Sequence, residues 1–91
     1  MDNKEDINND KLKEQFVNDN AKLNIGDVVR VSFYGRDAEV QDYNVIDRYY
    51  SSIIDDIIYT LEHNDTIILL MTVKESDIVL RDGIYVTVFK F

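Results

Sequence analysis

The chain has 91 residues, enough for one domain, and its 45% hydrophobic and 31% charged residues are typical of a globular protein rather than a disordered one. It contains no cysteine, which excludes disulfides and thiolate metal sites, and its net charge of −8 argues against direct binding to nucleic acid or to an anionic membrane. The longest uninterrupted apolar run, residues 67–71, is far shorter than the ~20 residues of a membrane span. The first residues do not resemble a signal peptide, so we expect a cytoplasmic protein.

The acidic charge is concentrated in one third of the chain. Residues 37–65 contain eight acidic residues against a single base, Arg48, and four of the six tyrosines lie in the same stretch. A charge of this size is common on small domains and keeps them in solution. The alternative is that the stretch binds a partner with a basic surface.

Residues 1–24 are polar and asparagine-rich, and the spacing of Leu12 and Phe16 predicts a short helix over about 10–18 that is docked or frayed. An α+β core is expected over 25–91. Residues 28–34 alternate in hydrophobicity and predict a strand, followed by a turn at 35–37 and a returning strand over 38–46. Gly26 and Asp27 followed by alternating valines resemble the start of SH3-like small barrels.

The segment 51–63 fits two structures. Its apolar residues, Ile53, Ile54, Ile57, Ile58 and Leu61, have the spacing of one helix face. Four isoleucines favour a strand, but a strand would place Asp55 and Asp56 on opposite faces and bury a carboxylate. We therefore predict a helix here, with the isoleucines packed on the sheet.

Residues 66–74 are apolar on both faces and predict a central strand. Residues 78–80 and 84–91 predict two further strands, and Asp82-Gly83 between them is a strong hairpin signal. The resulting order, α-β-β-α-β-β-β, predicts an α+β fold with an antiparallel sheet of about five strands and one main helix packed on it. The alternative is an SH3-like barrel with an inserted helix.

The sequence has few residues in patterns typical of a catalytic site. His63 is the only histidine, the three glycines are far apart, and no serine lies in a nucleophile-elbow context. The run from Glu62 to Asp65 holds four possible ligands, but neighbouring residues on a helix do not converge on one metal ion. We expect no enzyme activity, no cofactor and no metal site.

These observations favour a non-enzymatic acidic binding protein that occupies the basic nucleic-acid groove of a partner. In composition the chain resembles small phage or plasmid proteins that block restriction or CRISPR nucleases, and immunity proteins of nuclease toxins. The alternative is an assembly module that pairs through an exposed sheet edge. The partner-binding residues we predict are carboxylates and tyrosines of the acidic third: Glu39, Asp42, Asp47, Tyr49, Tyr50, Asp55, Asp56, Tyr59 and Glu62.

Overall fold

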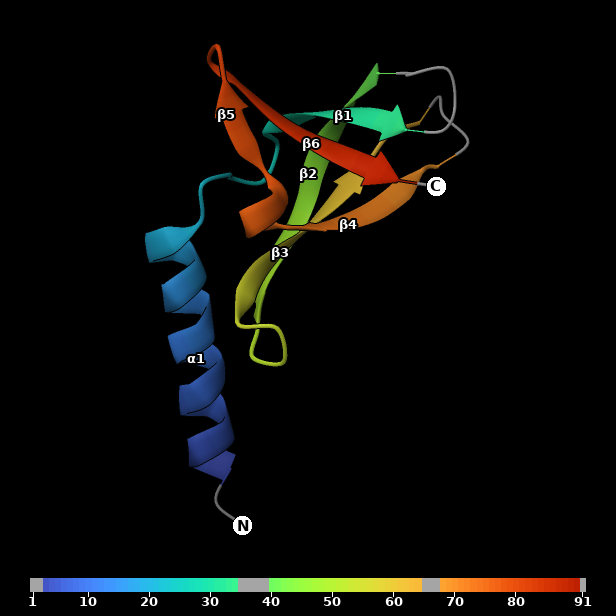
Figure 1. The fold of residues 1–91 in the computed structure, drawn as a ribbon. Helices are drawn as coiled ribbons and strands as arrows, with labels where there is room; N and C mark the ends of the chain where they lie inside the picture. The colour runs from blue at the N-terminus through green and yellow to red at the C-terminus, as the bar shows by residue number, and fades with distance from the viewer. Residues whose placement is uncertain (1–2, 35–39, 65–67, 91) are drawn as a thin grey trace.

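The protein is a curled six-stranded sheet with one α-helix beside it (Figure 1). The structure, a computed structural model, describes the backbone of residues 3–34, 40–64 and 68–90, and within these ranges the side chains from Lys11 onward. The elements are α1 (Asn3–Asn20), β1 (Val28–Tyr34), β2 (Val40–Ser51), β3 (Asp56–Glu62), β4 (Leu70–Lys74), the 3₁₀ turn η1 (Glu75–Asp77), β5 (Val79–Arg81) and β6 (Ile84–Lys90).

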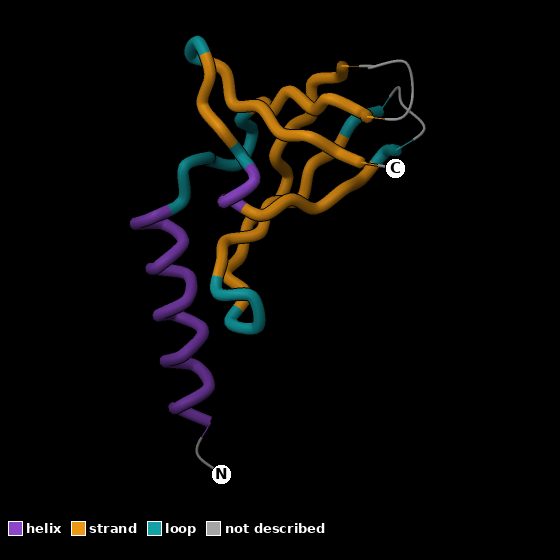
Figure 2. The backbone as a smooth tube through the Cα atoms, in the orientation of Figure 1, coloured by secondary structure: helices purple, strands orange, loops and turns teal. Residues whose placement is uncertain are grey.

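The strands lie in the order β4-β3-β2-β1-β6-β5, so the edge strands are β4 and β5. Neighbouring strands are antiparallel except β1 and β6, which are parallel. The two edge strands are consecutive in the chain and are joined only by η1 and Ile78. The sheet must therefore curl until its edges approach each other at η1, as the tube in Figure 2 shows.

The core fills the concave side of this curled sheet. Alternate residues of β1 and of the first half of β2 point inward, as the pleat requires, and the polar N-terminal segment adds Val17 and Leu23. The buried hydrophobic residues of the cluster are Val17, Leu23, Val29, Val31, Phe33, Tyr43, Val45, Ile57, Tyr59, Leu61, Met71 and Ile78.

The helix predicted over 51–63 is wrong. Residues 56–62 form β3, which pairs with β2 along its length and with β4 on its other side. A β2–β3 turn occupies residues 52–55, and Asp55 lies there with a φ of +51°, exposed to solvent. The strand begins at Asp56, whose carboxylate accepts hydrogen bonds, so the unpaired buried carboxylate that argued against a strand does not arise.

The isoleucines of this segment therefore have three different environments. Ile57 points into the core at 2% exposure, and Ile58 is buried on the opposite face. Ile53 and Ile54 lie in the turn and are 93% and 47% exposed. The spacing resembles that of a helix because Ile57 and Ile58 are buried on opposite faces of a strand, while Ile53 and Ile54 belong to the hairpin tip.

The predicted fold class needs correction as a whole. Over the described residues the sheet has six strands and a parallel pair, not five antiparallel strands, and the segment predicted as the main helix contains β3 instead. The alternative prediction, an SH3-like barrel with an inserted helix, is also wrong, because residues 51–63 contain no helix. The strand over 66–74 is β4 at the sheet edge rather than a central strand, and Leu69 and Leu70 are exposed.

Other local predictions are confirmed. The strand over 28–34 is β1, with Val29, Val31 and Phe33 buried, and the N-terminal helix exists but is longer than expected. Asp82 and Gly83 form the turn between β5 and β6 with positive φ angles of 52° and 78°. The turn predicted at 35–37 lies outside the described residues.

Candidate functional site

Four of the predicted partner-binding residues share the face of the sheet that points away from the core. Asp42 alternates with the buried Tyr43 along β2, and Glu62 follows the buried Leu61 on β3. A bulge between Val45 and Asp47 shifts the register by one residue. We use the name acidic face for the resulting outward group: Asp42, Asp47, Tyr49 and Glu62.

The bulge is what places Asp47 and Tyr49 on this face. Without the extra residue, an odd-numbered position of β2 would continue to point inward, like Tyr43 and Val45. With it, Asp47 pairs with Thr60 and Tyr49 pairs with Ile58 on the outer side of β3. Tyr49 remains 46% exposed, so its ring is available for contact.

Arg48, the base of the acidic third, points the other way and is held within the molecule. One terminal nitrogen donates to the Leu23 carbonyl at 2.7 Å and to Asn24 Oδ1 at 3.1 Å, and the other donates to Asn18 Oδ1 at 3.0 Å. Its charge is therefore used to hold the segment after α1. On the acidic face, the ion pair that the structure shows is Arg30 with Asp42, at 3.1 Å.

Tyr50 and Asp55 form a second group, at the base of the β2–β3 turn. The Tyr50 hydroxyl donates to the Asp55 carboxylate, and this hydrogen bond raises the pKa of Tyr50 above its usual value. The Tyr50 ring meets Phe16 of α1 edge-on, with centroids 4.9 Å apart. This aromatic contact fastens the helix to the hairpin and leaves the two projecting together from the sheet (Figure 1).

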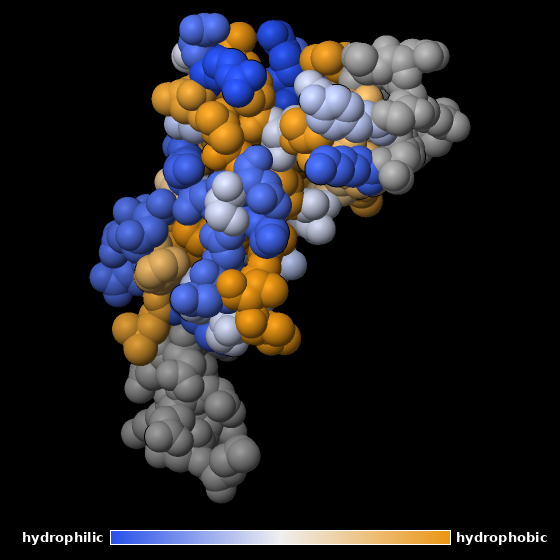
Figure 3. Space-filling view, viewed as in Figure 1, coloured by the Kyte–Doolittle hydropathy of each residue, from blue (hydrophilic) through white to orange (hydrophobic). Residues whose placement is uncertain are grey.

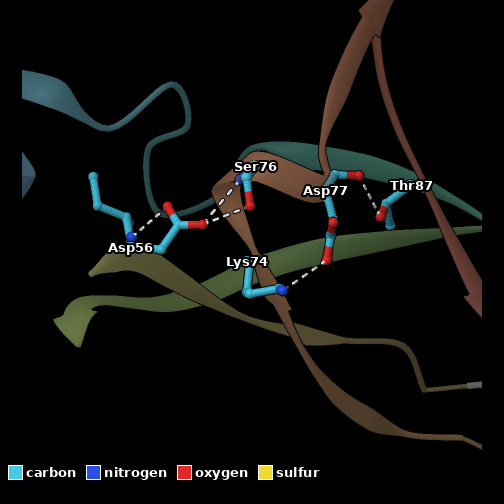
Figure 4. A network of polar contacts seen from close by, with 6 residues as sticks. Asp56, Lys74, Ser76, Asp77 and Thr87 are labelled. Carbon is cyan, nitrogen blue, oxygen red and sulfur yellow. Dashed lines mark hydrogen bonds and ion pairs between the residues drawn. The ribbon is translucent and has the colours of Figure 1, made fainter. Parts of the chain in front are cut away.

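Asp56 is engaged in a polar network rather than offered to a partner (Figure 4). Its carboxylate accepts hydrogen bonds from the Ser76 hydroxyl at 2.7 Å and from the Ile57 amide at 2.8 Å. Partial burial disfavours the charge, but these hydrogen bonds outweigh it, so the pKa of Asp56 lies below its usual value. The network holds η1 against β3, and nearby the buried Thr87 hydroxyl donates to the Asp77 carbonyl at 2.9 Å.

Tyr59 lies in the core and presents no surface to a partner. Its hydroxyl donates to Glu75 Oε1 at 2.6 Å and accepts from the Leu23 amide at 3.3 Å. Burial and the carboxylate of Glu75 raise the pKa of Tyr59. The ring was expected to point outward only because a helix was predicted here. Glu39 lies outside the described residues.

Exposed hydrophobic residues at the β2–β3 turn and on α1 were not among the predicted site residues. Ile53 and Ile54 stand at the hairpin tip, while Leu12 and Phe16 are exposed on α1. A shallow groove of about 320 Å³ lies between α1 and Tyr50 of β2, and its lining residues are Leu12, Lys13, Phe16 and Tyr50. Figure 3 shows hydrophobic and hydrophilic residues side by side on this part of the surface. The signal that could have found them is the excess of isoleucines over the number that one strand can bury.

No protein-family model, curated protein or solved structure matches this chain. Among the residues that the structure describes, no three acidic or histidine side chains are grouped so as to hold a metal ion. In the same residues, no helix is long and apolar enough to cross a membrane. What the acidic face offers is carboxylates and an aromatic ring on a paired sheet, which are groups suited to recognising a cationic surface.

Proposed function

We propose that this chain is a non-enzymatic acidic binding protein whose acidic face occupies the basic nucleic-acid groove of a partner enzyme. Carboxylates would stand where phosphates bind, and nucleic acid would be excluded by competition without any chemistry. An inhibitor of a restriction or CRISPR nuclease, or an immunity protein of a nuclease toxin, would act in this way. A cytoplasmic location belongs to the same proposal.

The observation that carries the proposal is the orientation of Arg48. Because its guanidinium is bound to Leu23, Asn24 and Asn18, it does not neutralise the carboxylates of Asp47 and Glu62. The backbone that carries these carboxylates is already fixed by strand pairing, so only side-chain freedom is lost when they meet arginines or lysines of a partner. Like-charged rows of this kind accelerate association with a basic surface and reject acidic ones.

The experiment is a competition assay with purified nucleases that hold a fluorescent DNA duplex in a basic groove. We expect the chain to displace the duplex from its target enzyme, and the apparent affinity to fall as salt rises, because exposed charges are screened. Asp47→Lys with Glu62→Lys should abolish displacement. Asp10→Lys with Asp19→Lys, which makes the same change in net charge on α1, is the matched control and should retain most of it.

Two results would count against the acidic face. One is equal inhibition by the Asp47/Glu62 variant and by the control variant, with the same salt dependence. The other is inhibition that persists unchanged at about 1 M salt, where the Debye length is only about 3 Å. In either case the contact would have to involve apolar surface instead.

A second candidate function, pairing of another chain at a sheet edge, is favoured by the exposed leucines of the edge strands. Leu70 on β4 and Leu80 on β5 are each 58% exposed, and edge strands offer unpaired backbone groups. The uncharged change Leu70→Asn should then weaken partner capture without altering the salt dependence. Capture that is unaffected by Leu70→Asn and by the corresponding change Leu80→Asn would argue against edge pairing.

A further inference from the structure

The outer surface of β1, β6 and β5 forms a groove of about 600 Å³ at the opposite end of the sheet from the β2–β3 turn (Figure 1). Its floor is apolar, because Val79 pairs with Val86 across β5 and β6 and Val88 lies two residues further along. The residues that line it are Ser32, Tyr34, Asp77, Val79, Arg81, Val86, Thr87, Val88 and Lys90.

This groove is basic, although the chain as a whole is acidic. Arg81 and Lys90 are exposed, and neither side chain forms an ion pair with any residue that the structure describes. The acidic residue of the lining, Asp77, has its carboxylate 3.8 Å from Lys74 Nζ. The groove therefore combines an apolar floor with two cations that form no ion pair among the described residues.

The β2–β3 turn has the complementary character. Ile53 is 93% exposed, Ile54 is 47% exposed, and Asp55 follows them with its carboxylate on the surface. The pair of isoleucines matches the valine floor, and the carboxylate matches Arg81 and Lys90. We propose that the groove receives the β2–β3 hairpin tip of a second copy of this chain.

The geometry requires that this contact forms between copies and not within one. The tip and the groove lie at opposite ends of one continuous sheet, so a single molecule cannot bring its own tip to its own groove. At about 0.15 M salt the Debye length is about 8 Å, so repulsion between the distant charges of two copies, each of net charge −8, is strongly screened. The charges of the tip and of the groove, which come into contact, then have the largest effect on docking.

Where one tip of a pair is bound, the contact is heterologous, and the free tip and free groove let further copies add. Where both tips are bound reciprocally, the pair closes as a two-fold dimer. The inference is independent of the proposed function, since it uses none of the acidic-face residues and the groove lies on other strands.

The test uses two variants of the full chain and analytical ultracentrifugation at about 0.15 M salt. The tip variant carries Ile53→Lys and Ile54→Lys, and the groove variant carries Arg81→Glu and Lys90→Glu. All four positions are exposed, so folding should be retained, and circular dichroism checks it. Lys11→Glu with Lys22→Glu changes the net charge as the groove variant does and serves as its control.

We expect the average mass of the unmodified chain and of the control to rise with concentration. Each variant alone should stay monomeric. An equal mixture of the two should form a complex of about twice the monomer mass and stop there, because only one intact tip and one intact groove are complementary. This rescue on mixing distinguishes tip-to-groove docking from a dimer formed through any other surface.

Three results would overturn the proposal. They are an unmodified chain that is monomeric at every concentration tested, either variant alone associating as the unmodified chain does, and a mixture of correctly folded variants that stays monomeric. None of these outcomes bears on displacement of nucleic acid by the acidic face, which is measured separately with the Asp47 and Glu62 variants.

Discussion

Replacing Tyr59 by phenylalanine tests how the segment between α1 and β1 is held to the sheet. The substitution removes one oxygen atom from a fully buried side chain and leaves the ring in place. That oxygen accepts from the Leu23 amide at 3.3 Å and donates to Glu75 Oε1 at 2.6 Å. Glu75 Oε1 also accepts from the Lys22 amide at 2.7 Å, so one hydroxyl links three parts of the chain.

The expected loss follows from these contacts. A hydrogen bond to a charged group contributes about 1.5–3 kcal/mol, and a buried amide left without its partner costs about 1–3 kcal/mol. Glu75 keeps the Lys22 amide and is partly exposed, so it can recover some hydration. We therefore expect Tyr59→Phe to lower the free energy of unfolding by about 2–4 kcal/mol, a large share of the 5–15 kcal/mol typical of a domain.

Urea unfolding monitored by circular dichroism measures this change. Tyr85→Phe is the matched control, because the Tyr85 hydroxyl makes a long, exposed contact of 3.4 Å to the carbonyl of Lys22 in the same segment. The control should change stability by less than about 0.5 kcal/mol. Equal stability losses in the two variants, or a loss below about 0.5 kcal/mol for Tyr59→Phe, would refute the reasoning.

The raised pKa of Tyr59 adds a second measurement. Because the folded state holds the hydroxyl neutral, its contribution to stability is fully present below the ordinary tyrosine pKa of 10.0 and is lost as the pH rises above it. The unmodified chain should therefore lose stability above about pH 10, and Tyr59→Phe should flatten that decline. An identical alkaline profile in the two proteins would contradict the assigned environment.

Three further predictions concern other parts of the fold. Ile57→Ala should lower the free energy of unfolding by about 2–5 kcal/mol, because the side chain is buried in the core; a loss below about 1 kcal/mol in urea unfolding would place it elsewhere. The pKa of Asp56 is lowered by folding, so its stabilising effect is present above its unfolded pKa and is lost as the pH falls through the folded value. Asp56→Asn should therefore make the free energy of unfolding depend less on pH in the acid range, and Ser76→Ala should do so in part. A pH dependence unchanged in both variants would count against the network. Gly83→Ala should cost about 1–2 kcal/mol, because φ is +78° at that turn, and a neutral result would show a different turn geometry.

Elements that depend on a short stretch of sequence were predictable, and elements that depend on contacts between distant segments were not. Alternation over 28–34 and the Asp82-Gly83 turn are local signals, and both elements were found. Over 51–63 the periodicity pointed to a helix because Ile53 and Ile54 were counted with the core. The segment forms a strand because it pairs with β2, and the hydrophobic pattern of one segment cannot show such an interaction with another.

The candidate site was predictable in composition but not in arrangement. The concentration of carboxylates and tyrosines over 37–65 is plain in the sequence, yet their faces depend on the bulge after Val45. A shift of one residue exposes Asp47 and Tyr49 and turns Arg48 inward. Tyr59 could not be distinguished from the exposed tyrosines, because its burial follows from contacts with Leu23 and Glu75, which are distant in sequence.

The parallel pairing of β1 with β6 also constrains the order in which the chain can fold. Arg30 pairs with Val86, so one edge of β1 stays open until nearly the whole chain has been synthesised. The β2–β3 hairpin and β4 can form earlier from neighbouring segments. Pairings between distant segments are slow, because the loop must close before the contact is gained. During synthesis, β1 is therefore a temporary edge strand open to neighbouring nascent chains, and a product ending before residue 84 would keep that edge permanently.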